Sequence, residues 1–450
     1  MGLASKLFTM LFLLCWFATA IAFSRSPRSV SFPGQTQWCK QAATSLQRKM
    51  RHQHQQPFIS MATEDKSKVN RGFGILEKAG GLLPQGNLVK TAKFGWKTIW
   101  KTFMAELAPQ SKDGSYVRPS YDFKGWISYD SKEFPGEEGR YHLYLGQPCP
   151  WCHRVSLAVA LRGLGPWVSS SYLVDDPERA SRGGWAFDRA GPRRDPAFGR
   201  ADLRELYDLL EPGYTGRCTA PLLVDKKSRK IVSNESGDIL KMLNEIRVAG
   251  RPHGLPDVDL RPPSLAAEID ALGDRLYTQL NNGVYRAGFA TTQGAYDAAV
   301  QGVFSALDEL EARLRGGGGG GKGGEGEGGG RGGPFLLGPR LTEADVRLFP
   351  TAVRFDAAYN TLFKCSKKRL ADYPYLMEWM RLMHSLPGVS DTIDIEDCRR
   401  SYFEQLFPLN PGGIVPIGAS KQDLGLVDFD ERTNSIDFGA IFYAHSNNQI

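Results

Sequence analysis

The 450-residue sequence predicts an α/β domain followed by an all-α domain. Residues 141–245 follow the order strand, helix, strand, irregular loop, two strands and helix. After the Gly- and Pro-rich stretch 250–263, apolar residues recur at the three- and four-residue spacing of amphipathic helices. A Cys-x-x-Cys motif at 149–152 lies where the first strand turns into the first helix, which is typical of a thioredoxin-like fold.

The net charge of +7 lies in the first part of the chain. Residues 1–63 hold seven Lys or Arg and no Asp or Glu, which leaves 49 basic and 49 acidic side chains in the remainder. A neutral body gives no electrostatic argument for nucleic-acid binding. Hydrophobic content of 41% is enough for a packed core.

The N-terminal segment has the composition of a two-part leader. An apolar run at 7–22 follows Lys6, ends in small residues and is too short for a confident membrane span, which predicts a signal peptide at 1–22. Residues 23–63 are rich in Ser, Arg and Gln and free of acids, as in a transit peptide. We expect delivery to a plastid, with simple secretion and an N-terminal membrane anchor as alternatives.

The rest of the chain divides by composition. We expect an N-terminal extension at 64–120, the thioredoxin-like domain at 121–250, the helical domain at 264–410 and a C-terminal tail at 411–450. A nearly pure glycine stretch at 316–333 interrupts the helical domain. Glycine offers neither packing surface nor helix propensity, so this stretch predicts a flexible insertion.

Each element of the first domain has a local signal. Strand-like residues 141–145 precede the Cys motif, and the helix that follows is expected at 152–164, with Gly163 or Gly165 and then Pro166 as its stop. A polar turn between two apolar runs predicts a hairpin. The further predicted elements are a short strand at 171–174, the hairpin strands 221–225 and 230–232, and a helix at 236–244.

Two apolar stripes and one cap mark the helices of the second domain. The stripes lie at 269–280 and 300–314, and both indicate core packing. Thr342, with Asp345 three residues later, resembles a capping box and predicts a helix start. Pro350 is expected to kink that helix or to end its first segment.

Cys149 is the predicted nucleophile, because a cysteine at a helix N-terminus is stabilised as the thiolate by free N–H groups and the helix dipole. The motif alone leaves three alternatives: attachment of a c-type haem, half of a zinc site, or two ordinary buried cysteines. No second Cys/His pair follows at finger-like spacing. Five scattered cysteines outside the leader form no disulfide framework and suit a reducing compartment.

An ordered set of motifs resembles the glutathionyl-hydroquinone reductases, the xi class of glutathione transferases. The resemblance covers about 121–418 apart from the glycine insertion, and it removes the haem interpretation. Its motifs are at 140–144, 149–154, 184–188, 234–236, 282–293, 341–349, 354–356 and 413–418.

The resemblance implies a thioredoxin-like domain joined to a helical glutathione-transferase domain. It implies removal of glutathione from glutathionyl-hydroquinones through a mixed disulfide on Cys149, with glutathione as co-substrate and no permanently bound cofactor or metal. It also implies a homodimer. The partners are then glutathione and glutathionylated quinols.

Six residues are the expected glutathione contacts. Ala220, before a cis Pro221, would pair its backbone with glutathione like an added strand. Glu235 and Ser236 at a helix start would hold the γ-glutamyl group. Trp185 matches a family tryptophan, and Arg217 is a weaker candidate for a charge contact.

Tyr285 and Tyr402 match tyrosines that face the quinol, where a phenol can donate to or accept from a ring oxygen, and Tyr359 is a lesser candidate. The chain departs from the family at Cys152, where the usual motif has alanine, and at Ala220, where valine is commoner. A second thiol permits an intramolecular disulfide. A glutaredoxin-like or dehydroascorbate-reductase-like enzyme therefore remains an alternative, as does a non-catalytic protein that binds glutathione or quinones.

Overall fold

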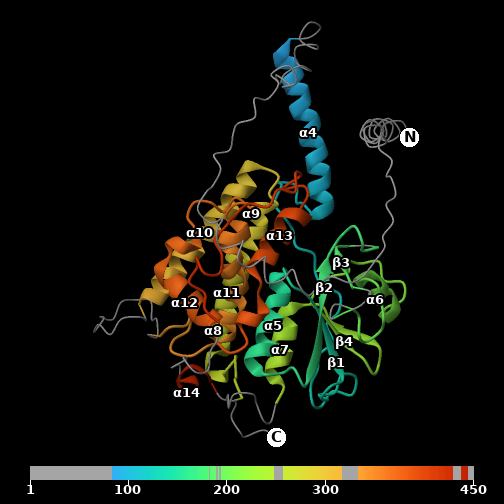
Figure 1. The fold of residues 1–450 in the computed structure, drawn as a ribbon, viewed down its shortest axis with the longest axis vertical. Coiled ribbons are helices and arrows are strands. Elements are labelled where there is room, and N and C mark those ends of the chain that lie inside the picture. The colour runs from blue at the N-terminus through green and yellow to red at the C-terminus, as the bar shows by residue number, and fades with distance from the viewer. Residues whose placement is uncertain are drawn as a thin grey trace, which may run out of the picture. The chain divides into compact units, whose positions relative to one another are not determined.

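The computed structural model describes residues 84–181, 183–188, 191, 194–247, 257–316, 333–428 and 437–443 (Figure 1). The predicted leader, the first part of the extension and residues 317–332 of the glycine insertion lie outside the described residues, so the predictions made for them stay predictions. The sheet and the helical domain both belong to one unit, which begins at Gly86.

The thioredoxin-like domain is built on one mixed sheet with the strand order β3-β2-β1-β4-β5. β1 runs parallel to β2, whereas β4 pairs antiparallel with both β1 and β5. The predicted order of strands, hairpin and helices is confirmed, except that the region expected as an irregular loop holds a short strand, Trp185–Ala186, and a helix, Leu203–Leu210. The strands are β1 Tyr141–Gly146, β2 Val168–Asp175, β3 Trp185–Ala186, β4 Leu222–Asp225 and β5 Lys230–Ser233.

Both faces of the sheet are covered, because successive side chains of a strand point to opposite faces. Leu143 and Leu145 belong to the main core with helices α5 (Pro150–Arg162) and α7 (Ser236–Glu245). Tyr144, between them, belongs to a second core with α6 (Leu203–Leu210). Figure 1 shows α5 and α7 between the sheet and the helical domain, with α6 on the far side of the sheet.

The first predicted helix begins and ends two residues earlier than expected. α5 starts at Pro150, because proline suits the first turn of a helix and Cys149 supplies the N-cap. It ends at Arg162, where Gly163 takes the left-handed conformation at φ 61° and donates its N–H to Ala160. The expected strand at 171–174 is longer in the structure, since pairing with β1 extends β2 to Val168–Asp175.

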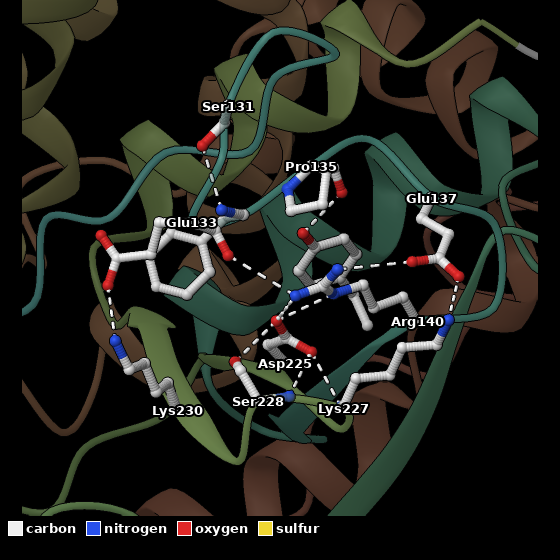
Figure 2. A network of polar contacts seen from close by, with 11 residues as sticks. Ser131, Glu133, Pro135, Glu137, Arg140, Asp225, Lys227, Ser228 and Lys230 are labelled. Carbon is white, nitrogen blue, oxygen red and sulfur yellow. Dashed lines mark hydrogen bonds and ion pairs between the residues drawn. The ribbon is translucent and has the colours of Figure 1, made fainter.

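The amino end of β1 is held by a polar network (Figure 2). Arg140 donates from Nε to Asp225 Oδ2 at 2.9 Å and also pairs with Glu137 at 3.3 Å. Lys227, on the β4–β5 turn, and Lys230, at the start of β5, form ion pairs with Glu137 and Glu133. The segment that leads into β1 is thereby fastened to the hairpin.

The second domain is helical, as predicted. Thr342 and Asp345 form the predicted capping box. The expectation that Pro350 ends a helix segment is wrong: α11 continues through it, with buried residues on both sides whose packing outweighs one lost backbone hydrogen bond. The helices are α8 Ala266–Leu276, α9 Gly283–Gly288, α10 Gln293–Arg315, α11 Glu343–Arg354, α12 Pro374–His384 and α13 Ile395–Gln405, with π-helical turns at Tyr277–Asn281 and Phe355–Tyr359 and the short α14 Phe438–Ile441 in the tail.

The N-terminal extension contributes the helix α4, Gln85–Leu107, and a loop that packs on the helical domain. The Gln110 amide donates to the Phe289 carbonyl at 3.1 Å, and the Thr292 hydroxyl donates to the Asp113 carbonyl at 2.7 Å. No helix in the described part of the chain combines the length and the hydropathy that a bilayer crossing requires.

Candidate active site

Cys149 lies at the point where β1 ends and α5 begins. It is the N-cap of α5, and its Sγ accepts from the Cys152 N–H at 3.4 Å. The Cys149 side chain is half-buried, whereas Cys152 is fully buried, and neither forms a disulfide. One thiol is thus accessible and the other is held behind it.

The two thiols have opposite acidity. Burial alone raises the pKa of Cys149, but hydrogen bonds from the Cys152 thiol and from the N–H groups of Cys152 and Trp151, together with the charge of Arg354, lower it to about 7. Burial, and then the neighbouring Cys149, raise the pKa of Cys152 well above its ordinary value. At pH 7, about half of Cys149 is therefore a thiolate that accepts from a protonated Cys152, and this fraction rises above pH 7.

The Ala220–Pro221 peptide bond is cis, as predicted. Cys149 Sγ lies 3.9 Å from the Ala220 carbonyl oxygen. Within the described chain, the N–H of Ala220 makes no hydrogen bond. The N–H of this residue is therefore free while its carbonyl faces Cys149 Sγ, and an extended peptide can add there like a strand.

Arg354, the last residue of α11, holds the loop between β1 and Cys149. Its side chain is fully buried. Nε donates to the Pro148 carbonyl at 2.9 Å, and Nη2 donates to the Gln147 carbonyl at 3.3 Å. The helical domain thus supplies the group that positions the loop leading to the nucleophile.

The buried imidazole of His153 links Arg354 to Thr392. The Thr392 hydroxyl donates to the Val389 carbonyl at 2.6 Å, so its oxygen is left to accept from His153 Nε2 at 2.8 Å. His153 Nδ1 then accepts from Arg354 Nη1 at 2.7 Å. Burial and the Arg354 charge lower the pKa of His153 well below its ordinary value, which keeps the ring neutral in this tautomer.

Three of the expected glutathione contacts have defined local partners. Trp185 stacks against Gly146 so closely that a Cβ on Gly146 would come within 2.3 Å of the indole. Glu235 caps α7 by accepting from the Gly237 N–H at 2.9 Å. Ser236 is buried, and its hydroxyl donates to Glu235 Oε1 at 3.3 Å.

Arg217 lies on the wall of a cavity of about 340 Å³. Thr219 and Asn234, which directly precede Ala220 and Glu235, line the same cavity, and the buried Oδ1 of Asn234 has no hydrogen-bond partner. Cys149, Trp185 and Glu235 are not among the lining residues, so the cavity lies beside the thiolate rather than on it.

The three tyrosines converge. Tyr402 on α13 lies in the middle, with its hydroxyl 2.5 Å from that of Tyr285 and 3.1 Å from that of Tyr359. Tyr285 remains partly exposed, whereas Tyr359 and Tyr402 are buried. Tyr359, the lesser candidate, is therefore part of the cluster, while Tyr285 presents it to the solvent side.

All three phenols are neutral at physiological pH. Burial raises the pKa of Tyr359 to about 12 and those of Tyr285 and Tyr402 well above their ordinary value. The charge on Cys149 further raises the pKa of Tyr285, so this phenol and the thiolate are close enough to interact. Neutral phenols can donate hydrogen bonds to a substrate oxygen.

Trp151 lies between two guanidinium groups. Arg118 is 4.0 Å and Arg154 is 4.6 Å from the centre of its indole ring. Arg118 also donates from Nε to the Tyr121 hydroxyl at 3.1 Å. The extension therefore reaches the residue two positions after Cys149.

Sequence reasoning missed Arg354, Arg118 and Thr392 as parts of the site. Arg354 belongs to one of the family motifs, but its role in holding the Cys149 loop depends on a contact between two domains. In the described residues, no group of three or more His, Cys, Asp or Glu could hold a metal ion.

Two family models match the chain. The glutathione S-transferase N-terminal domain matches residues 148–246, and the C-terminal domain matches residues 293–382. The chain is 39% identical to the glutathionyl-hydroquinone reductase PcpF of Sphingobium chlorophenolicum over 74% of this chain and 96% of PcpF. It is also 39% identical to the glutathionyl-hydroquinone reductase YqjG of Escherichia coli K12, over 69% of this chain and 90% of YqjG.

Solved structures agree with these relatives. The xi glutathione transferase of Phanerochaete chrysosporium is 37% identical with a TM-score of 0.61, and the match covers 71% of this chain and 97% of that one. The glutathione-bound structure of YqjG is 38% identical with a TM-score of 0.58, and covers 70% of this chain and 97% of that one.

Proposed function

The chain belongs to the glutathionyl-hydroquinone reductases, the xi class of glutathione transferases, and we propose that it reduces glutathionyl-hydroquinones with Cys149 as the nucleophile. The observation that carries the proposal is an accessible thiol of pKa about 7 at the start of α5. Its Sγ lies 3.9 Å from the carbonyl oxygen of Ala220, whose N–H is free in the described chain. The Tyr285 ring contacts the ring of Trp151, two residues after Cys149. The Ala220 backbone suits glutathione and the Tyr285 phenol suits a quinol oxygen.

In the first step, the Cys149 thiolate attacks the sulfur of the glutathionyl-hydroquinone. The carbon–sulfur bond breaks, and its electron pair stays on the ring carbon, which takes up a proton to give the hydroquinone. Cys149 is left as a mixed disulfide with glutathione. Neutral Tyr285, supported by Tyr402 and Tyr359, donates to the ring oxygen and stabilises negative charge on the departing ring.

In the second step, the thiolate of a second glutathione attacks the glutathione sulfur of the mixed disulfide. Glutathione disulfide leaves and the Cys149 thiolate returns, so the net reaction oxidises two glutathione sulfurs and reduces one ring carbon. We assign the glutathione contacts to Trp185, Arg217, Ala220 with Pro221, Glu235 and Ser236, with glutathione as co-substrate and no resident cofactor. The family resemblance supports a homodimer, which sedimentation of the purified protein tests.

Replacing the nucleophile tests this function. Cys149→Ser is expected to abolish release of hydroquinone from a glutathionyl-hydroquinone, whereas Cys365→Ser, at a buried cysteine with a pKa of about 12, is the matched control and retains activity. Mass spectrometry of the Cys152→Ser protein is expected to place glutathione on Cys149. Equal turnover by Cys149→Ser and wild type would refute the proposal.

A second candidate activity, dithiol–disulfide exchange, is favoured by the position of Cys152. Its buried thiol is hydrogen-bonded to Cys149. A resolving thiol needs this position to attack a mixed disulfide on Cys149. That attack would expel glutathione and form a Cys149–Cys152 disulfide, which two further glutathiones would reduce. Turnover of a small disulfide substrate that is lost in Cys152→Ala and kept in Cys365→Ala supports this activity; equal turnover in both rejects it.

We also propose that residues 1–63 deliver the protein to a plastid. The support is compositional: an apolar run followed by an acid-free, Arg- and Ser-rich stretch that begins with Phe23. A fluorescent reporter fused after Thr63 is expected in the plastid and, with Phe23→Ala, outside it. Secretion of the unaltered fusion contradicts the proposal.

A further inference from the structure

Helix α4 exposes large apolar side chains in its middle part, from Phe94 to Phe103. Trp96 and Ile99 are 63% and 46% exposed, and Phe103 is 44% exposed. At about 100° per residue, these three side chains fall within an arc of about 60° on one side of the helix. Phe94, 74% exposed, adds a further ring outside this arc. Exposed rings and aliphatic groups gathered on one element indicate a binding surface.

The C-terminal part of α4 is anchored to the rest of the protein. Trp100 Nε1 donates to the Pro408 carbonyl at 3.1 Å, and the rings of Phe103 and Phe407 meet edge to face at 5.6 Å. Met104 is completely buried. The helix is therefore held at one end, while the apolar side chains toward its start have no comparable cover in the described residues.

The anchoring loop extends the apolar surface. Phe407 is 48% exposed, and in the same loop Ile414 and Ile417 are 76% and 103% exposed. Because this loop touches α4 through Phe407, both segments belong to one side of the protein. We call α4 together with 407–417 the apolar surface.

Lysines flank the apolar side of α4. Four lysines recur at spacings of three or four residues and fall within an arc of about 80°, which a sector of about 60° holding the anchored Trp100 separates from the apolar arc. Glu106, near the anchored end, is the only acidic residue of the helix. The lysines, all exposed, are Lys90, Lys93, Lys97 and Lys101.

We propose that α4 docks on the surface of an anionic lipid bilayer. A helix with Trp, Phe and Ile on one side and lysines beside them can bury the apolar side chains among acyl chains while the ammonium groups meet anionic headgroups. α4 lies on the bilayer and does not cross it. The exposed Ile414 and Ile417 add a second contact with the same surface.

Charge decides between lipid and a second copy of the chain. A two-fold pair formed through α4 would bring the two lysine stripes close together with one glutamate each to offset them, and like charges repel. An anionic bilayer offers both the apolar interior and the opposite charge. The inference stands on α4 and its loop, and it does not depend on the proposed reductase activity.

Hydrogen–deuterium exchange of the full chain tests the proposal, since it reports on α4 separately from any binding by the predicted leader. Vesicles of phosphatidylcholine with about one third phosphatidylglycerol are expected to slow exchange in residues 88–101 about tenfold or more. High salt is expected to reverse the part of this protection that depends on charge. Vesicles of phosphatidylcholine alone are expected to protect much less.

Two variants and a control complete the test. Lys93→Gln with Lys97→Gln is expected to weaken the α4-dependent binding about 30-fold, at about 1 kcal/mol per lysine. Trp96→Ser with Ile99→Ser is expected to remove the protection. Lys227→Gln with Lys230→Gln removes the same charge from the β4–β5 hairpin and should change neither result (Figure 2).

Two outcomes overturn the proposal. One is equal protection by neutral and anionic vesicles together with no effect of the lysine changes. The other is protection of α4 without vesicles that grows with protein concentration, which would assign the apolar surface to a second copy of the chain. Retained hydroquinone release by the α4 variants shows that they are folded.

Discussion

Each end of strand β1 is held by an arginine, and the two arginines have different surroundings. At the amino end, Arg140 pairs with the carboxylates of Asp225 and Glu137. At the carboxyl end, Arg354 donates to the carbonyls of Gln147 and Pro148, to an imidazole and to the Pro350 carbonyl. Among the described residues, no carboxylate lies within ion-pair distance of Arg354.

Arg140 therefore has a structural role, whereas Arg354 also exerts an electrostatic effect on the site. The charge of Arg140 is cancelled locally, so its effect is confined to fastening the loop before β1. The charge of Arg354 is not cancelled, and in a buried setting it acts over a longer range. It lowers the pKa of Cys149 and offsets part of the rise that burial causes in the pKa of Tyr359, while the neutral His153 beside it stays unprotonated. The uncancelled cation lies at the end of β1 that carries the nucleophile.

Arg354→Met should give the largest effect. It removes the cation and leaves the Gln147 and Pro148 carbonyls unpaired, so we expect hydroquinone release to fall about 100-fold or more. Arg354→Lys, which keeps the charge but loses the forked geometry, should recover part of the loss. Steady-state kinetics of a correctly folded variant measures the fall in hydroquinone release. A fall no larger than that of Arg140→Met would contradict the distinction between the two arginines.

Removing phenol hydroxyls comes next. Tyr285→Phe is expected to lower kcat by about 10- to 100-fold, since a neutral phenol no longer donates to the ring oxygen. Tyr402→Phe, which removes the central hydroxyl of the cluster, should lower it less. The matched control is Tyr375→Phe on α12, a residue outside the cluster. Unchanged kcat in Tyr285→Phe would assign that tyrosine to packing alone.

The pH dependence of Cys149 alkylation tests how much the Arg354 charge contributes to thiol acidity. The folded-state pKa of Cys149 is about 7, so its thiolate fraction, and with it the rate of alkylation by iodoacetamide, should rise through pH 7 and level off above pH 8. In Arg354→Met the midpoint should move upward only modestly, because the hydrogen bonds from Cys152 and Trp151 lower this pKa more than the Arg354 charge does. An unmoved midpoint would show that hydrogen bonds alone set the acidity.

Arg140→Met should have the smallest effect on activity, within about threefold, and a measurable effect on stability. It leaves the fully buried Asp225 carboxylate with fewer partners, at a cost of about 2–3 kcal/mol in the free energy of unfolding. The side chain of Arg140 is 13% exposed, so solvent screening reduces this cost only slightly.

The pKa of Asp225 determines how the stability loss in Arg140→Met varies with pH. Burial raises its pKa, but hydrogen bonds from Arg140 and Ser228 outweigh this and lower it below 3.8. A lowered folded-state pKa stabilises the protein above the unfolded value and loses this contribution as pH falls through the folded value. The loss of unfolding free energy in Arg140→Met, relative to wild type, should therefore be constant above about pH 5 and shrink below pH 4. Urea unfolding at several pH values measures it.

The sequence alone determined the parts of the molecule that depend on neighbours in the chain. The strand and hairpin pattern, the Thr342–Asp345 cap and the cap formed by Cys149 at the start of α5 are set by residues a few positions apart. Family motifs also located the tyrosines. The boundaries of α5 lie two residues earlier than expected because Pro150 fits the first helical turn. Periodicity does not resolve this detail.

Tertiary structure alone decided which charges act on the site. Arg140 and Arg354 are both arginines of family motifs, and nothing in their local sequence separates a cation paired at the edge of the sheet from one that is buried without a carboxylate. The partners of Arg354 in the thioredoxin-like domain lie about 200 positions away, and His153 is 201 residues from it. Such contacts form only when the two domains pack, because burial and distance, rather than sequence spacing, set the strength of an electrostatic interaction.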